Sequence, residues 1–358
     1  MKKSVLATAI LLTAALLFSG CGSSSKAPEE APKAAAPAAA EQKEEPAKES
    51  STPAKAKIET LKLGFPDNGK NAPADALAVA HEKGFIAEEL NKLGVKFELI
   101  PFVGVGPAIN EALASKSLDV GIYGDTPGFI SKSAGTDTTL IAAGNTALGA
   151  SFVVPIDSPI TSVKELKGKK VATAKGSFMH RTFIEALKAE GLTVKDVEFF
   201  NMNGPESDAA ILSKKIDAAV LSDSSAYKYV VNKTGKIIAG TKEHPDWAGH
   251  NLAIARTAFA RENPEVIVAL IKGLIRGEKY ANENQEETKK IWAKGGTPVE
   301  VLNLMYPDNK FPIHTEITQS VIDNLTKNKD FLLENGLIKN DVDLSKWIDK
   351  SYYEQAIK

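Results

Sequence analysis

The sequence predicts an α/β fold in which short, buried strands alternate with helices. From Lys57 onward, apolar runs typical of buried strands alternate with segments whose apolar residues recur at helical spacing. Several of these strands lead directly into a glycine-containing turn that opens a helix. Strands separated by helices favour parallel pairing with right-handed crossovers, and ligands bind beyond the carboxyl ends of such strands. The chain has 358 residues, 43% of them hydrophobic, so it is long enough for two ordinary domains.

The clearest strand–turn–helix unit is residues 168–191, GKKVATAKGSFMHRTFIEALKAEG. Residues 169–174 are expected to form a strand, 175–177 a tight turn, and Phe178 the start of a helix. This order directs the free N–H groups of the first helical turn, and the positive end of the helix dipole, toward the space beyond the strand. Such an arrangement binds anions and polar ligands. The alternative is that Ser177 only caps its own helix.

The other strands and helices follow the same alternation, and the pattern is nearly all helical from Asn263 onward. Further strands are expected at 61–65, 97–102, 119–122, 140–143, 152–155, 197–201, 218–221, 236–239 and 251–255. Further helices are expected at 74–93, 108–114, 209–214, 264–282, 286–292, 298–305 and 316–334, and after 343–345. Residues 162–165, Ser-Val-Lys-Glu, fit a capping box on a short helix.

The first 56 residues predict a secretion signal and a tether. Two lysines, an apolar run at 5–18 and small residues before Cys21 are typical of a signal peptide at 1–20, and the run is short for a membrane span. Its end, LLFSGC, resembles a bacterial lipobox, which implies that Cys21 is lipidated and anchors the chain on the extracytoplasmic face of the cell membrane. The alternative is an ordinary secretory signal with an incidental cysteine. Residues 21–56 are rich in Ala, Pro, Glu, Lys and Ser, which predicts a flexible linker.

Composition excludes several classes of function. The formal charge of -1, without a basic run interleaved with aromatic residues, argues against a nucleic-acid partner. A single cysteine excludes an internal disulfide framework. The five histidines have no HExxH or close-paired spacing, so a zinc enzyme is disfavoured. We therefore expect no metal site, and no residue pattern indicates a cofactor.

Five segments, in unbroken order over roughly residues 61–275, resemble the aliphatic-sulfonate, nitrate and taurine substrate-binding proteins of ABC importers. The segments are GFIAEELNKLGVKFELIPF, GPAINEALASKSLDVGIYGDTPGFISKSAG, VVPIDSPITSVKELKGKKVATAKGSFMHRTFIEALKAEGL, DAAILSKKIDAAVLSD and NPEVIVALIKG. The resemblance implies the two-lobed periplasmic-binding-protein-like fold (type 2), with a ligand cleft between the lobes. It places lobe 1 at 58–147 plus 246–358 and lobe 2 at 148–245.

The resemblance also implies a function. The chain is expected to be a monomeric, lipid-anchored solute-binding protein that closes around a small ligand (a sulfonate, taurine or a related compound) and delivers it to an ABC permease with its ATPase. No catalysis is expected. Two alternatives stay open on the same fold: a ligand-sensing or adhesive lipoprotein, and an enzyme of the thiamine-precursor type.

Five turns are expected to converge on the cleft, at 66–71, 104–107 and 124–127 from one lobe and at 176–180 and 222–225 from the other. Backbone N–H groups at helix starts, with the hydroxyls of Thr126 and Ser177, would hold a small oxyanion. The predicted ligand-binding residues are Asn68, Gly104, Asp125, Thr126, Ser151, Ser177, Phe178, His180, Asp223, Ser224 and His250.

Some of these residues have structural alternatives. Asp125 is expected to cap its own helix unless it faces the cleft. His180 is placed at the surface or near the hinge, and Arg181 in a solvated ion pair with Glu185, one helical turn away. Trp247 forms a wall of the cleft or packs in the core.

The chain departs from its sulfonate-binding relatives at 221–225, Leu-Ser-Asp-Ser-Ser, where those relatives tend to carry a tryptophan beside the aspartate. Small hydroxyl side chains replace an aromatic wall there. If Asp125 and Asp223 both face the cleft, the ligand is expected to be an amine or a zwitterion in place of a simple anion.

Overall fold

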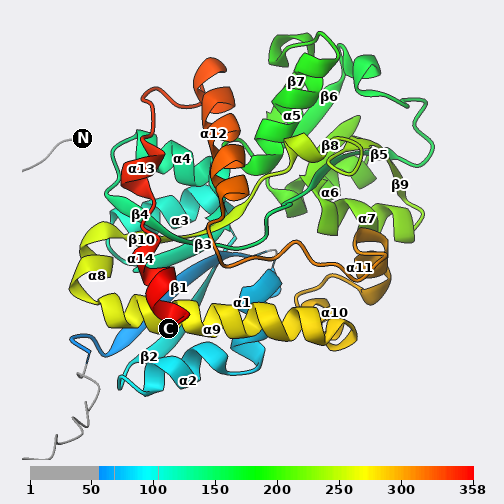
Figure 1. Cartoon of the computed structure of the whole chain (residues 1–358). Helices are drawn as coiled ribbons and strands as arrows, with labels where there is room; N and C mark the ends of the chain where they lie inside the picture. The colour runs from blue at the N-terminus through cyan, green and yellow to red at the C-terminus, as the bar shows by residue number, and fades with distance from the viewer. Residues whose placement is uncertain (1–55, 68, 104) are drawn as a thin grey trace, which may run out of the picture. The chain divides into compact units, whose positions relative to one another are not determined.

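The computed structural model describes residues 56–67, 69–103 and 105–358. The expected signal peptide, Cys21 and most of the linker lie outside these residues, as do Asn68 and Gly104. The described part contains two five-stranded sheets with helices packed against them (Figure 1). The predicted α/β class is therefore confirmed.

Sheet 1 has the strand order β2-β1-β3-β10-β4. Its strands are β1 (Thr60–Pro66), β2 (Lys96–Phe102), β3 (Val120–Gly124), β4 (Thr138–Ala143) and β10 (Asn251–Arg256). Strand β1 runs parallel to β2 and β3, whereas β10 runs antiparallel to β3 and β4.

Sheet 2 has the order β7-β6-β8-β5-β9. Its strands are β5 (Ala150–Pro155), β6 (Lys170–Thr173), β7 (Glu198–Asn201), β8 (Ala218–Ser222) and β9 (Gly235–Gly240). Strand β6 is parallel to β7 and β8, and β5 is antiparallel to β8 and β9. The expectation of purely parallel pairing is wrong for one strand in each sheet. In both sheets the antiparallel strand is the one that arrives directly from the other sheet, so it enters from the opposite end.

The helices cover both sheets. They are α1 (Asp75–Glu82), α2 (Phe85–Asn91), α3 (Val105–Ala114), α4 (Asp125–Ser133), α5 (Phe178–Ala189), α6 (Gly204–Leu212), α7 (Asp223–Val231), α8 (Thr257–Glu262), α9 (Pro264–Glu283), α10 (Gln285–Lys294), α11 (Val299–Met305), α12 (Gln319–Glu334), α13 (Leu344–Trp347) and α14 (Ser351–Ala356). Short 3-10 helices are η1 (Val163–Leu166), η2 (Val194–Asp196) and η3 (Pro245–Trp247).

Two local expectations are wrong. The single helix expected at 74–93 is two helices, α1 and α2, because Gly84 between them has φ 72°, a left-handed conformation that glycine adopts without steric cost. The capping box expected at 162–165 is absent, since the Ser162 side chain makes no capping bond. Instead, the Glu165 carboxylate accepts a hydrogen bond from the Thr161 backbone N–H at 2.7 Å.

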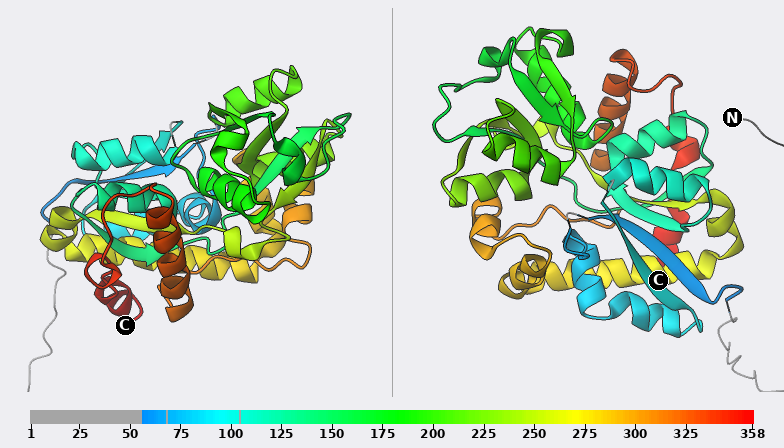
Figure 2. Two further views of the ribbon diagram at one scale, coloured as in Figure 1. Left: turned by 90° about the horizontal axis from the view of Figure 1, so that it is seen from above. Right: turned by 180° about the vertical axis from the view of Figure 1, so that it is seen from behind.

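The long helix α9 runs beside α1 and α2 (Figure 2), and its glycines permit the close approach. A Cβ at Gly273 would lie 2.7 Å from the Ile86 Cα, and one at Gly277 would lie 2.6 Å from the Ala76 carbonyl oxygen. Leu61 and Leu63 of β1 are fully buried in the same core. Sheet 2 has a separate core around Phe152 and Phe183.

Two segments connect the sheets: residues 144–149, between β4 and β5, and 241–250, between β9 and β10. We call them the crossing segments. They pair with each other, because the Leu148 N–H donates to the Gly249 carbonyl at 2.8 Å and the Gly249 N–H donates to the Leu148 carbonyl at 3.0 Å. Since both segments begin at strand ends, they join the two sheets at the edges where ligands are expected.

Candidate functional site

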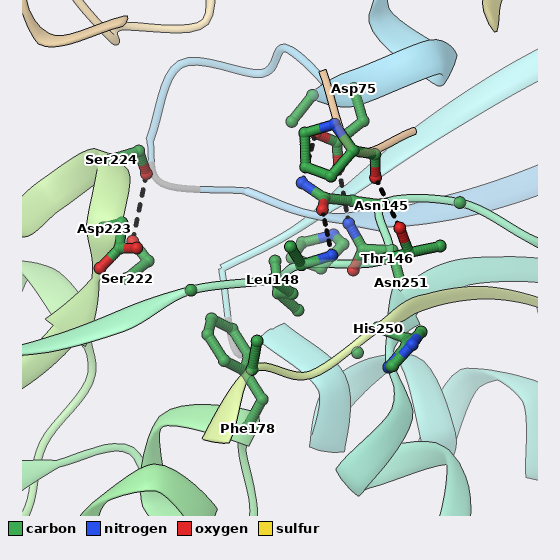
Figure 3. Close-up of a pocket in the computed structure, with 18 of the residues that line it drawn as sticks. Asp75, Asn145, Thr146, Leu148, Phe178, Ser222, Asp223, Ser224, His250 and Asn251 are labelled. Carbon is green, nitrogen blue, oxygen red and sulfur yellow. Dashed lines mark hydrogen bonds between the residues drawn. The ribbon is translucent and has the colours of Figure 1, made fainter. Parts of the chain in front are cut away.

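A pocket of about 730 Å³ lies at the crossing segments, and residues associated with both sheets line it. Sheet 1 contributes the ends of β1, β3 and β4, through Pro66, Gly124 and Ala143. Sheet 2 contributes the starts of α5 and α7. Figure 3 shows Asp75 with Asn145 and Asn251 on one side of this pocket and Asp223 with Ser224 on the other. The expected cleft between two strand-end edges is therefore present.

The predicted ligand-binding residues fall into three groups. Those that line the pocket are Ser177, Phe178, Asp223, Ser224 and His250. Those that are buried in the described structure but do not line it are Asp125, Thr126, Ser151 and His180. Asn68 and Gly104 lie outside the described residues, although their neighbours Asp67 and Val105 line the pocket.

Ser177 caps α5 and lines the pocket at the same time. Its Oγ accepts a hydrogen bond from the His180 N–H at 3.3 Å and donates to the Ala174 carbonyl at 2.6 Å. The capping role is thus confirmed. Phe178 and Met179, on the first turn of α5, also line the pocket. Because the first N–H groups of a helix have no intrahelical acceptor, this turn offers donors to a ligand.

His180 faces the core of sheet 2, so the expected surface position is wrong. Its side chain is 5% exposed and packs against Phe183 and Phe199, with ring centroids 6.3 and 5.4 Å away. Burial, with a smaller contribution from the charge of Lys175, lowers the pKa of His180 to about 4. The ring is therefore neutral near pH 7 and acts as a packing residue.

Asp223 begins α7, and its side chain connects that helix to β5 and to the second crossing segment. Its carboxylate accepts hydrogen bonds from Ser151 Oγ at 2.6 Å and Thr241 Oγ1 at 3.2 Å. Gly149 is required beside it, because a Cβ there would lie 1.9 Å from Asp223 Oδ2. Burial raises the pKa of Asp223.

Asp75 is the corresponding residue beside sheet 1: it connects α1 to the first crossing segment and to β10. It was not among the residues predicted from the sequence. Its carboxylate accepts from Asn145 Nδ2 at 3.0 Å and Asn251 Nδ2 at 2.7 Å, and burial raises its pKa. Asp75 has φ 55°, a left-handed conformation uncommon outside glycine. An acid at a helix start is usual for local reasons, so no signal in the sequence distinguished Asp75.

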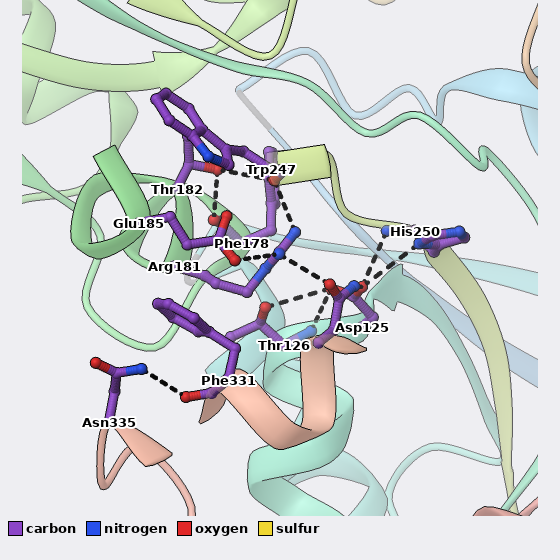
Figure 4. Close-up of polar contacts among 11 residues, drawn as sticks. Asp125, Thr126, Phe178, Arg181, Thr182, Glu185, Trp247, His250, Phe331 and Asn335 are labelled. Carbon is purple, nitrogen blue, oxygen red and sulfur yellow. Dashed lines mark hydrogen bonds and ion pairs between the residues drawn. The ribbon is translucent and has the colours of Figure 1, made fainter. Parts of the chain in front are cut away.

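His250 lines the pocket from the end of the second crossing segment. Its side chain is 2% exposed, and neither ring nitrogen has a hydrogen-bond partner among the described residues. The ring lies beside Asp125, with Nδ1 3.6 Å from Asp125 Oδ2 (Figure 4).

Asp125 belongs to a buried network around Arg181 that joins α4, α5 and α12. We call Asp125, Arg181, Glu185 and Asn328 the Arg181 network. Arg181 Nη1 donates to Glu185 Oε1 and to Asn328 Oδ1, both at 2.9 Å, and Nη2 donates to the Trp247 carbonyl at 2.8 Å. Asn328 Nδ2 in turn donates to Asp125 Oδ2 at 2.6 Å. The ion pair with Glu185 is confirmed, but the Arg181 side chain is fully buried and not solvated as expected.

The acids of the Arg181 network differ in pKa. For Asp125, burial alone would raise the pKa, but the neighbouring His250 side chain and the charge of Arg181 lower it below its ordinary value. For Glu185, burial raises the pKa to about 7 against the opposing charge of Arg181. Asp125 does not cap α4 through a side-chain bond at the N-cap, which is Gly124; its Oδ1 accepts instead from the next residue, Thr126.

Trp247 packs in the core of sheet 2 and stacks on His244, with ring centroids 3.8 Å apart. It does not line the pocket, so packing is its role. Among the described residues, no three His, Cys, Asp or Glu side chains are grouped so as to hold a metal ion. In the same part of the chain, no helix combines the length and the apolar character needed to cross a membrane.

Comparisons with known proteins agree with this architecture. The sequence profile of the NMT1/THI5-like family matches residues 73–288. A protein of Bacillus subtilis (strain 168), provisionally named an aliphatic sulfonates-binding protein, is 25% identical over 285 residues, which are 79% of this chain and 85% of that protein.

Solved structures share the fold. The periplasmic sulfonate-binding protein SsuA of Methylobacillus flagellatus KT is 28% identical with a TM-score of 0.70, and the match covers 84% of this chain and 94% of that chain. This likeness confirms the two-lobed periplasmic-binding-protein-like fold. The desulfurization enzyme DSZB matches at 16% identity and a TM-score of 0.65, over 84% of this chain and 99% of that chain. At this identity the match shows a shared fold only.

Proposed function

The chain belongs to the NMT1/THI5-like family, and on that premise we propose that it is an extracytoplasmic solute-binding protein of an ABC importer. It encloses a small organic ligand (a sulfonate, taurine or a related compound) and delivers it to a permease with its ATPase. The observation that carries the proposal is the pocket of about 730 Å³ lined from both sheets. The B. subtilis and M. flagellatus relatives are named binding proteins, which supports binding over catalysis.

The ligand is expected to contact the polar groups at the strand ends. Ser177 and Phe178 offer the first turn of α5, whereas Asp223, Ser224 and His250 line the remaining wall. Asn68 and Gly104 stay predictions from the sequence. Asp125, Ser151 and His180 would act on the ligand through the residues that they support.

Ligand binding is proposed to close two lobes, residues 58–147 plus 246–358 and residues 148–245, about the crossing segments. Closure expels water and brings polar groups of both lobes to one ligand, and the closed form is what the permease recognises. We propose that the protein acts as a monomer; a pocket whose two walls both come from one chain is compatible with this.

The N-terminal residues are proposed to anchor the protein. A signal peptide at 1–20 would be removed, Cys21 would carry the lipid, and residues 21–56 would tether the binding unit to the extracytoplasmic face of the membrane. Growth of producing cells with labelled palmitate tests this proposal. Label in the protein that Cys21→Ser abolishes supports it, and an unlabelled protein contradicts it.

Binding is tested by calorimetry and thermal unfolding with sulfonates, taurine, nitrate, carboxylates, amino acids and pyrimidines. A ligand at a hundred times its dissociation constant adds about 2.7 kcal/mol to the free energy of unfolding, which raises the melting temperature by several degrees. No binder across the panel would contradict transport and favour a sensing or adhesive role. Because DSZB shows that this fold also supports catalysis, the binders are also followed for turnover, which would revive the enzyme alternative.

A further inference from the structure

The charges on the pocket wall are arranged by depth. Asp75 and Asp223 are partly buried, whereas the three lysines of the wall, Lys242, Lys310 and Lys327, are exposed. No arginine occurs among the described lining residues. The inner wall is therefore negative, and its cations lie at the rim.

Among the described residues, neither carboxylate forms an ion pair, and the charge of Lys242 only partly offsets the effect of burial on the pKa of Asp223. Asp75 is bonded by two side-chain amides, and Asp223 by two hydroxyls, all of them neutral donors. No lysine, arginine or histidine of the described chain lies within ion-pair distance of either carboxylate. A carboxylate offers about four acceptor sites, so each retains capacity for a further donor. Buried charges in proteins are ordinarily paired.

Other groups at the same site favour a charged ligand. Burial raises the pKa of Tyr306, and the negative charges of Asp75 and Asp223 raise it further, so the two acids act on one phenol that also lines the pocket. The His250 ring is 2% exposed and lines the same pocket; among the described residues neither nitrogen has a hydrogen-bond partner, and Nδ1 lies 3.6 Å from Asp125 Oδ2. A buried polar ring without a partner is rare unless a ligand completes its bonding.

We propose that the pocket selects ligands that carry a cationic, hydrogen-bond-donating group, a protonated amine or an amidinium, and holds that group against the pocket carboxylates Asp75 and Asp223. This inference rests on the proposed solute-binding function and narrows its ligand class. The cation supplies the counter-charge that the protein itself does not provide, and its N–H groups fill the free acceptor sites of the carboxylates. A sulfonate or carboxylate without an amine would instead meet two desolvated anions.

Calorimetry with matched compounds tests the inference. The pairs are ethanesulfonate with taurine, propanoate with β-alanine, and benzoate with benzamidine. In each pair we expect the amino or amidino compound to bind about tenfold or more tightly, as one charge-assisted bond implies. In Asp223→Asn this preference should fall about ten- to hundredfold, because the amide removes the charge at nearly constant volume. Asp157→Asn, an exposed acid paired with Lys214 outside the pocket, is the matched control.

The outcomes separate the inference from the function. Equal affinity within every pair, or an unchanged preference in folded Asp223→Asn, overturns the cationic ligand class and leaves solute binding standing. If Asp223→Asn does not fold, Asp75→Asn is measured in its place, with the same expectation for the second carboxylate. A panel without any binder overturns the inference together with the proposed function.

Discussion

Two groups of buried acids lie near the crossing segments, and they differ in whether the protein supplies a cation. In the Arg181 network, Asp125 and Glu185 lie close to a fully buried guanidinium. In the pocket, the side chains that bond to Asp75 and Asp223 in the described part of the chain are neutral. Burial raises the pKa of both pocket acids, and in the Arg181 network it raises that of Glu185 to about 7, whereas the pKa of Asp125 is lowered. The comparison separates acids that complete the fold from acids that are left available to a ligand.

The largest expected effect comes from removing the buried cation. Arg181→Met leaves Asp125 and Glu185 without their counter-charge, so we expect a loss of about 3–5 kcal/mol in the free energy of unfolding. Urea denaturation measures the loss. Arg276→Met is the control, since Arg276 pairs with Glu88 and Glu89 near the surface and should cost about 1 kcal/mol or less. Equal losses in the two variants would show that the Arg181 network is not the stabilising region.

The pH dependence of stability tests Glu185. Its pKa rises from 4.5 unfolded to about 7 folded, so between these values the folded state binds more protons at this site. Stability from this group is therefore present below about pH 4.5 and is lost as the pH rises through 7, by about 3 kcal/mol. Glu185→Gln removes this loss. The free energy of unfolding of the variant should therefore rise relative to that of the wild type as the pH increases from 4.5 to about 7. His180, whose pKa is lowered, contributes an opposite slope equally in both proteins. A constant difference across the interval would contradict the raised pKa of Glu185.

A pair of isosteric substitutions compares the two groups directly. Asp125→Asn weakens charge-assisted bonding to Asn328 and the attraction to Arg181, and should cost about 2 kcal/mol. Asp223→Asn removes an anion without a counter-charge, so its cost should be under about 1 kcal/mol. Thermal unfolding of both variants measures these two losses of stability, and the loss in Asp125→Asn should be the larger. The reverse order would mean that the pocket acid supports the fold more than the network acid does.

Ser177 joins the two regions, because it caps the helix that carries Arg181 and also lines the pocket. Ser177→Ala should cost about 1 kcal/mol of stability through the lost cap and should weaken ligand binding. Ser213→Ala, at the exposed end of α6, should change stability by about 0.5 kcal/mol or less and leave binding unchanged. Loss of stability with unchanged affinity would restrict Ser177 to its structural role.

Local patterns predicted much of the fold. Every strand expected from the sequence is present, with bounds that differ by at most two residues. Strands are predicted well because a short apolar run between two turns is a local feature of the sequence. The cap at Ser177 was predicted for the same reason: a hydroxyl before a helix satisfies N–H groups two or three positions away. The ion pair between Arg181 and Glu185, one helical turn apart, was equally local.

What the sequence by itself determined about this protein is the order of its strands, most of its helices, the cap at Ser177 and, through the resemblance, the two-lobed fold. The tertiary structure alone decided which polar residues are buried together. Strands β5 and β10 are antiparallel because the chain crosses between sheets. Arg181 is buried because Asn328, 147 positions away, and the Trp247 carbonyl surround it. Asp75 reaches the pocket because Asn145 and Asn251 hold its carboxylate. Tertiary packing decides which side chains are buried and which distant residues they contact. The local sequence pattern does not specify that packing.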